Sequence, residues 1–223
     1  MDFYRSMKRL SFWPMALLLV EVLVLPSCGE EDDTTGKAFG HEYVDLGLPS
    51  GLLWATMNIG AEKPEDFGSP FAWGETGVKD FYVWDTYKYY NGGLTKYVAD
   101  GDAADGLTSL ELRDDAAAVN WGGSWRMPTA TEQEELCKEC TWTRDTLNGV
   151  KGYNVKGPNG KSIFLPSRGT VGRYVYFWSS SLCPDNSEEA IMLSCFFYGT
   201  SIFPGLSAVS RSSDIPVRAV LEP

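Results

Sequence analysis

The sequence predicts an α+β domain with short antiparallel strands, one or two helices and long loops. Three observations point to this class. Apolar segments are short, and Gly-rich turns separate them. Two dipeptides, Asn148-Gly149 and Asn159-Gly160, are typical of the tight turns that join antiparallel strands. Residues 131–140 combine a cap with good helix formers and form the clearest helix signal.

The chain begins with the pattern of a secretory signal peptide. Arg5, Lys8 and Arg9 make a basic start, and residues 12–25 are almost wholly apolar. This apolar stretch is shorter than the roughly 20 residues that a membrane-spanning helix needs. We therefore expect residues 1–27 to direct export and to be removed afterwards.

The end of the apolar stretch resembles the lipobox of bacterial lipoproteins. Leu25-Pro26-Ser27-Cys28 places an aliphatic and a small residue ahead of a cysteine. The resemblance implies that Cys28 carries fatty acyl chains such as palmitate and anchors the chain to the outer membrane. A cleaved signal with an incidental cysteine is the alternative. Residues 28–39 are acidic and polar, so we expect a flexible tether; it resembles the signal that sends some lipoproteins to the cell exterior.

Residues 40–223 follow as one domain, because no second linker or repeat interrupts them. Residues 81–90 are rich in aromatic side chains and fit either a strand or a packed loop. In the helix, either Thr129 or Thr131 can cap, since Glu132 and Glu134 lie three residues later. The expected strands are residues 43–46, 52–55, 149–155 and 162–165, a strand around Trp178, and residues 190–197 and 217–221.

Composition excludes several classes of function. The net charge of −11 would repel the phosphates of a nucleic acid, so we expect no nucleic-acid partner. The single histidine, His41, rules out a histidine-pair metal site. No phosphate-cradling glycine loop precedes a helix. We therefore expect no catalytic residue, no metal and no cofactor.

Several phrases together resemble one family, the major paralogous domain of bacterial surface lipoproteins. The resemblance covers nearly all of residues 40–220. It rests on YVDLGLPSGLLWA from Tyr43, FAWGE from Phe71, WGGSWRMPT from Trp121, NGV at Asn148, IFLP at Ile163, WSSS at Trp178 and VRAV at Val217. The family is similar to C-type-lectin-like folds. It implies that the strands at residues 43–46 and 217–221 pair, that Trp54, Trp125 and Trp178 are core, and that Arg126 and Arg218 satisfy buried carbonyls or carboxylates.

The C-terminal region also resembles the variable proteins of diversity-generating retroelements. Adenine-directed mutagenesis of an AAC codon cannot produce Lys, Glu, Gln, Met or Trp. These five types make up 40 of the 223 residues, yet none occurs in residues 193–221. A buried strand followed by a Ser/Gly loop is the alternative explanation. A near-identical template repeat and a reverse-transcriptase gene beside this gene would support diversification. Their absence, together with differences between close relatives that are not of the adenine type, would exclude it.

The expected ligand-binding residues lie towards the C-terminus. They mix aromatic side chains, which offer large contact area, with small polar ones, and we expect them in loops near the C-terminal strands. For each aromatic residue, a place in the core is the alternative. The residues are Tyr174, Tyr176, Phe177, Phe197, Tyr198, Ile202, Phe203, Leu206, Arg211, Ser213 and Asp214.

Two other chemistries have weaker sequence support. Asp185, Asn186, Glu188 and Glu189 could offer oxygen ligands to calcium, but an acidic surface loop explains them better. Cys183 and Cys195 could form a disulfide or act separately, and Cys137 and Cys140 form a poor zinc motif. The sequence therefore indicates a lipid-anchored binding module for an extracellular protein or glycan. Alternatives are a structural or adhesin lipoprotein without a variable site and, with less support, a formylglycine-generating-type enzyme.

Overall fold

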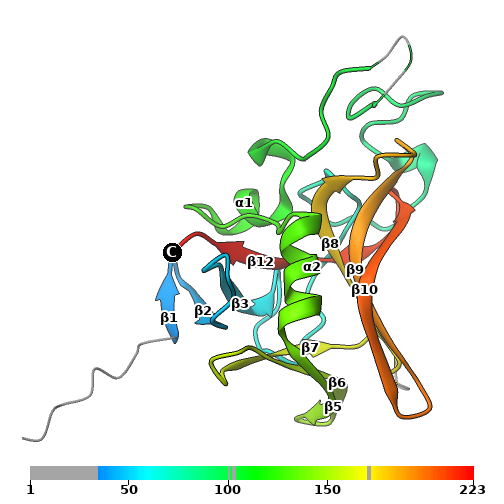
Figure 1. Ribbon diagram of the computed structural model, residues 1–223. Coiled ribbons are helices and arrows are strands. Elements are labelled where there is room, and N and C mark those ends of the chain that lie inside the picture. The colour runs from blue at the N-terminus through cyan, green and yellow to red at the C-terminus, as the bar shows by residue number, and fades with distance from the viewer. Residues whose placement is uncertain (1–34, 100, 102–103, 170–171) are drawn as a thin grey trace, which may run out of the picture. The chain divides into compact units, whose positions relative to one another are not determined.

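The computed structural model describes residues 35–99, 101, 104–169 and 172–223 (Figure 1). In this part of the chain, mostly antiparallel strands form three sheets and a two-stranded ribbon, accompanied by two α-helices. The expected α+β class with short antiparallel strands is therefore confirmed. The expected leader (residues 1–27) and the expected anchor Cys28 lie outside the described residues.

The first sheet joins the N-terminal strands to the last strand. Its order is β1 (Thr35–Ala38), β2 (His41–Asp45), β3 (Leu53–Asn58), β12 (Arg218–Leu221). Figure 1 shows β12, in red, beside the cyan β3. The expected pairing of residues 43–46 with residues 217–221 is therefore wrong. A tight turn, in which Gly51 N donates to Leu48 O at 2.9 Å, folds β3 back onto β2, so only the far edge of β3 can take β12.

Part of the segment expected to be a tether, residues 28–39, belongs to the folded domain. Residues 35–38 form β1, which pairs with β2 from Thr35↔Val44 to Ala38↔His41. The indole of Trp125 also donates to Ala38 O at 3.1 Å. Hydrogen bonding to the open edge of β2 thus draws these residues into the folded domain.

The second sheet comes directly after the longer helix in the chain. Local sequence signals set the start of this helix and the first hairpin turn of the sheet. Helix α2 (Ala130–Glu139) has a capping box, in which Thr129 Oγ1 accepts from Glu132 N and Glu132 accepts from Thr129 N. Thr129 is therefore the cap rather than Thr131. Asn148 and Gly149 adopt positive φ values of 48° and 88°, as a tight hairpin turn requires. The sheet is formed by β5 (Thr141–Leu147), β6 (Val150–Lys156) and β7 (Ser162–Pro166).

A largely irregular segment connects β3 to α2. The aromatic-rich residues 81–90 form a packed loop with one 3₁₀ turn, Trp84–Thr86, and not a strand. A second 3₁₀ turn, Leu112–Asp114, leads into helix α1 (Ala116–Trp121), which is capped by the carboxylate of Asp115. The two-stranded ribbon pairs β4 (Pro70–Phe71) with β11 (Ile215–Pro216).

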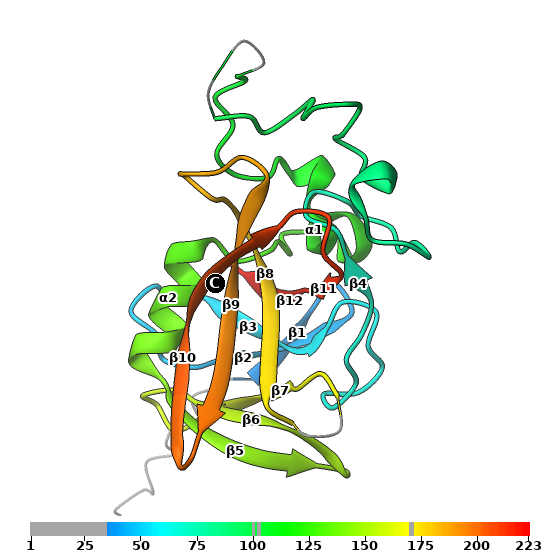
Figure 2. The same cartoon turned by 90° about the vertical axis from the view of Figure 1, so that its right-hand side faces the viewer.

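The third sheet carries the C-terminal hairpin. Figure 2 shows its strands side by side in the order β10 (Ser201–Ser210), β9 (Glu189–Tyr198), β8 (Tyr174–Leu182), with α2 packed against them. Ile202, Phe203 and Leu206 were expected in loops, but they lie on β10. Pro204, Gly205 and several serines give residues 201–210 a weak strand propensity. Their unbroken ten-pair register with β9 overcomes this weak propensity.

Two apolar clusters form the core of this domain. One lies among α2 and the three sheets and includes Trp54; the other lies under the irregular segment and includes Trp125 and Trp178. These three indoles are at most 1% exposed, as expected. Arg126 binds the carboxylates of Glu132 and Glu222, and Arg218 binds buried carbonyls, so both arginines are framework residues.

Candidate functional site

Four aromatic side chains form a continuous row across the third sheet. Tyr174 on β8, Phe196 on β9 and Phe203 on β10 are direct cross-strand neighbours. The ring centroids of Phe196 and Phe203 are 5.2 Å apart, and those of Tyr174 and Phe196 are 6.3 Å apart. Tyr176 extends the row along β8, stacked on Tyr174 at 5.9 Å. We call these four residues the aromatic row.

The row is open because the opposite face of the sheet is the buried one. Side chains alternate along a strand, so Val175, Phe177 and Cys195 point into the core cluster beside α2 while the row points away from it. Tyr174 and Phe196 are each 39% exposed and Phe203 is 46% exposed. Core packing on one side therefore leaves these three rings exposed on the other, whereas Tyr176 is half-buried against the core cluster that includes Trp178.

One charged group lies beside the row, the guanidinium of Arg173, whose central carbon is 5.4 Å from the ring centroid of Tyr174. The neighbouring positions on β9 and β10 are uncharged. The positions next to the row on the same face of β9 and β10 include Ser194, Gly205 and Ser207, and the two serine hydroxyls hydrogen-bond at 2.9 Å. A Cβ added at Gly205 would meet no atom within 4 Å, so this position is a gap in the surface. Burial, with a contribution from Tyr174, raises the pKa of Tyr176, which therefore stays a neutral hydroxyl at physiological pH. Apart from Arg173 at the Tyr174 end, the face offers apolar contact and neutral hydrogen bonds.

The tip of the β9–β10 hairpin extends this face. Gly199 and Thr200 make the turn, and Gly199 has a φ of 61°, which favours glycine. Tyr198, at the end of β9, is 73% exposed. Tyr198 therefore adds another exposed aromatic ring, on the same face of β9 as Phe196.

The structure divides the expected ligand-binding residues into three groups. Tyr174, Tyr176, Tyr198 and Phe203 lie on the open face, although on strands and not in loops. Phe197 and Ile202 pack partly against the inner core cluster, and Leu206 is exposed on the same inner side of β10. Ser213 and Asp214 lie in the turn before β11, where Asp214 pairs with Arg168.

Phe177 and Arg211 are not at the surface, so the expectation that they contact a ligand is wrong. Phe177 is 2% exposed because it alternates with the outward-facing Tyr176. Arg211 is fully buried, and its guanidinium donates to Tyr87 Oη, to Lys96 O, and to the carbonyls of Tyr97 and Ser187. Arg211 therefore holds the irregular segment in place.

Phe196 is the member of the row that the sequence interpretation missed. It lies between Cys195 and Phe197, in a run of three aromatic residues whose orientation composition cannot assign. The period-two signal was available, since Phe196 and Tyr198 must share a face once a strand is assumed. Because Ile202, Phe203 and Leu206 were expected in loops, no strand was predicted to pair with Phe196. The shared face of Phe196 and Phe203 therefore could not be identified from the sequence.

The described cysteines are free thiols. The considered disulfide between Cys183 and Cys195 is not formed, and Cys137 and Cys140 are also unpaired. Burial raises the pKa of Cys137, Cys140 and Cys195 to about 12 each, the opposite of the shift that activates a nucleophilic thiolate. Among the described residues, no group of three His, Cys, Asp or Glu side chains is arranged to hold a metal ion.

Comparison with protein-family models, with curated proteins and with solved structures finds no match. Within the described part of the chain, no helix is long and apolar enough to span a membrane. Fold and site together define an α+β domain that presents an exposed aromatic surface on an antiparallel sheet.

Proposed function

We propose that this protein is a lipid-anchored binding module of the cell surface with a C-type-lectin-like domain. It recognises an extracellular protein or glycan through its C-terminal face, which the sequence resemblance marks as variable, and it performs no catalysis. The observation that carries the proposal is the aromatic row, in which Tyr174, Phe196 and Phe203 stay exposed at the surface.

Energetics favour this surface as a contact site. Exposed aromatic rings that lie together in a monomer mark an interface, because each ring gains free energy when a partner removes it from water. The sheet backbone and the stacking between rings restrict the side chains before binding, so less conformational entropy is lost. Tyrosine, serine and glycine are also the residue types that antibody paratopes use for adaptable recognition.

The binding test compares substitutions in the row with a matched substitution elsewhere. The full-length chain, displayed on a bacterial surface, is screened against arrays of extracellular proteins and surface glycans. For a retained ligand, Phe196→Ser and Phe203→Ser should each weaken binding by about tenfold or more, as loss of a central aromatic anchor does. Gly205→Glu should have a similar effect, since it introduces a charge into the face without a backbone clash.

Phe81→Ser is the control for that test. Phe81 is 71% exposed but lies in the irregular segment, so its loss removes an exposed ring without touching the row. Equal binding by the parent and all the row variants, or an equal loss with Phe81→Ser, would show that recognition does not use this face.

The anchor is tested separately at Cys28. Labelled palmitate should be incorporated into the parent chain and not into Cys28→Ala, because only a thiol at this position accepts the lipid. Cys183→Ala, a substitution of a buried thiol within the domain, should leave incorporation unchanged. Incorporation into Cys28→Ala at the parental level would refute the lipoprotein assignment.

A further inference from the structure

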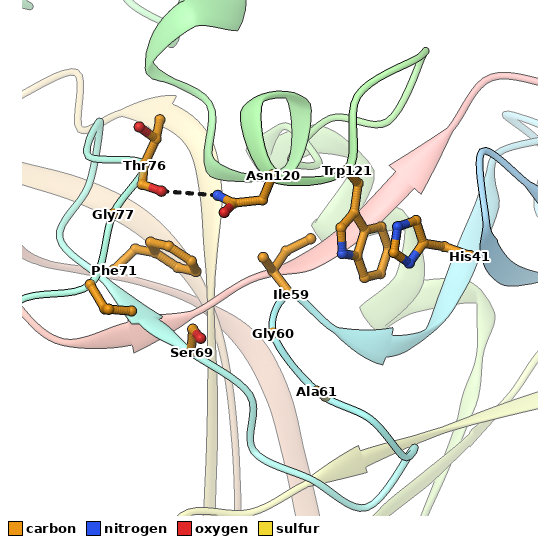
Figure 3. A pocket seen from close by; sticks show the side chains of 11 residues that line it. His41, Ile59, Gly60, Ala61, Ser69, Phe71, Thr76, Gly77, Asn120 and Trp121 are labelled. Carbon is orange, nitrogen blue, oxygen red and sulfur yellow. Dashed lines mark hydrogen bonds between the residues drawn. The ribbon is translucent and has the colours of Figure 1, made fainter.

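A pocket of about 560 Å³ lies outside the third sheet, at the junction of the first sheet with α1. Figure 3 shows its lining: His41 and Trp121 on one side, Phe71 on the other, and Asn120 and Thr76 across the top. These residues come from the start of β2, the end of α1, and β4 with its flanking loops. A pocket of this size suits a small molecule.

The wall made by His41 and Trp121 is preformed. The two rings stack with centroids 3.9 Å apart and planes 8° from parallel. Trp125 packs edge-on against both, at 5.1 Å from Trp121 and 6.4 Å from His41. Burial and then the nearby Lys37 lower the pKa of His41, so the imidazole is neutral at physiological pH.

The amide of Asn120 has one orientation, because both of its hydrogens are used. Asn120 Nδ2 donates to Thr76 O at 2.9 Å and to Ala116 O at 2.7 Å. The amide oxygen is left as an acceptor that faces the pocket (Figure 3). Together with the side chains of Ser69, Thr76 and His41, it supplies uncharged donors and acceptors to a ligand.

The lining selects against charged ligands. None of the eleven lining residues is Lys, Arg, Asp or Glu, and a neutral His41 adds no charge. An anion or cation entering this pocket would lose hydration without gaining an ion pair. Apolar surface from Ile59, Phe71 and Val78 favours a ligand that also has a non-polar face.

We propose that this pocket binds a neutral, hydroxyl-bearing ring of the size of one sugar unit. Such a ring combines hydroxyl groups for Asn120, Ser69, Thr76 and His41 with C–H surface for the apolar wall. The site shares no residue with the aromatic row and does not depend on the function proposed for it.

The test titrates the full-length chain with glucose, galactose, mannose and N-acetylglucosamine. The readout is the indole N–H resonance of Trp121, assigned by its disappearance in Trp121→Phe. At least one neutral sugar should shift this resonance saturably, with a Kd on the order of 1 mM. Glucuronate and glucose 6-phosphate should produce no saturable shift, because the pocket cannot pair their charges.

A variant that fills the pocket supplies the decisive control. Gly77 lines the pocket, a Cβ there meets no atom within 4 Å, and its φ is not positive, so Gly77→Leu should fold normally. It should abolish the sugar-dependent shift, whereas Gly93→Leu, at an equally open glycine outside the pocket, should retain it. Gly205→Glu should also retain it, which separates this site from the aromatic row.

Two results would overturn the assignment. One is the absence of any saturable shift up to about 50 mM neutral sugar, far above a millimolar Kd. The other is sugar binding by Gly77→Leu that equals that of the parent. Equal binding of glucuronate and a neutral sugar would overturn the ligand class.

Discussion

Replacing Arg218 with Met is expected to lower the free energy of unfolding by about 3–5 kcal/mol. Arg218 is 1% exposed, and its guanidinium donates to Asn58 Oδ1 at 2.8 Å, to Ala55 O at 2.9 Å and to Phe164 O at 3.0 Å. These acceptors belong to β3 and β7, so one side chain from β12 joins the first and second sheets. Methionine fills much of the same volume but donates no hydrogen bond.

Chemical denaturation of Arg218→Met and of a surface control measures this effect. The side chain of Arg113 is 73% exposed and pairs with Glu111 at the surface, so Arg113→Met should leave the free energy of unfolding close to that of the parent. Burial lowers the pKa of Arg218, because the charged guanidinium loses its hydration. The hydrogen bonds to the three acceptors compensate for this loss of hydration. A loss below about 1 kcal/mol for Arg218→Met would contradict this account.

Asp114→Asn is expected to cost about 2–4 kcal/mol at neutral pH. The side chain of Asp114 is 3% exposed, and its carboxylate accepts from Lys96 Nζ at 2.5 Å, Tyr97 Oη at 2.8 Å and Lys88 Nζ at 2.9 Å. Asparagine keeps the shape but removes the carboxylate that Lys88 pairs with and leaves Lys96 with Glu111 as its anion. The Lys88 side chain is 48% exposed, which reduces its share of the loss.

The same substitution should change how stability depends on pH. Burial alone would raise the pKa of Asp114, but the hydrogen bonds led by that from Lys96 lower it, so the net pKa lies below its ordinary value. A lowered folded-state pKa gives stabilisation that is complete above the unfolded value of about 3.9 and is lost as the pH falls towards the folded value. The parent should therefore lose stability below about pH 4 more steeply than Asp114→Asn.

The measurement is the free energy of unfolding of both proteins between about pH 7 and pH 2. The difference in free energy of unfolding between parent and variant should become smaller as the carboxylate of Asp114 becomes protonated. Asp80 is exposed, so Asp80→Asn should have the same pH dependence of the free energy of unfolding as the parent. A difference that stays constant over the whole range would show that Asp114 does not bind its lysines as a carboxylate.

Local interactions explain which elements could be predicted from the sequence. The start of α2 depends on Thr129 and Glu132, which are three residues apart and satisfy each other's backbone donors. The β5–β6 hairpin depends on Asn148 and Gly149, whose preference for positive φ sets the turn. Such signals act within a few residues, so they are legible before any tertiary contact is known.

The composition of the candidate site was predictable in the same way, but its geometry was not. Aromatic and small residues concentrate near the C-terminus, and Tyr174, Tyr176, Tyr198 and Phe203 lie on the open face as their mixture suggested. Phe177 has the same chemistry and is buried, because its strand position turns it inward. Composition identifies the side chains available for binding, whereas strand phase decides which of them a ligand can reach.

Local sequence signals predicted the α+β class, the capped helix and two hairpin turns, and the family resemblance predicted the tryptophans of the core. The pairing of β12 with β3, the strand β10, the burial of Arg211 and the place of Phe196 in the aromatic row emerge from tertiary contacts. The two groups differ in the range of the interactions that stabilise them. Caps and turns are stabilised by neighbours in the chain, whereas sheet edges and buried cations take partners from distant segments, whose identity depends on the whole fold.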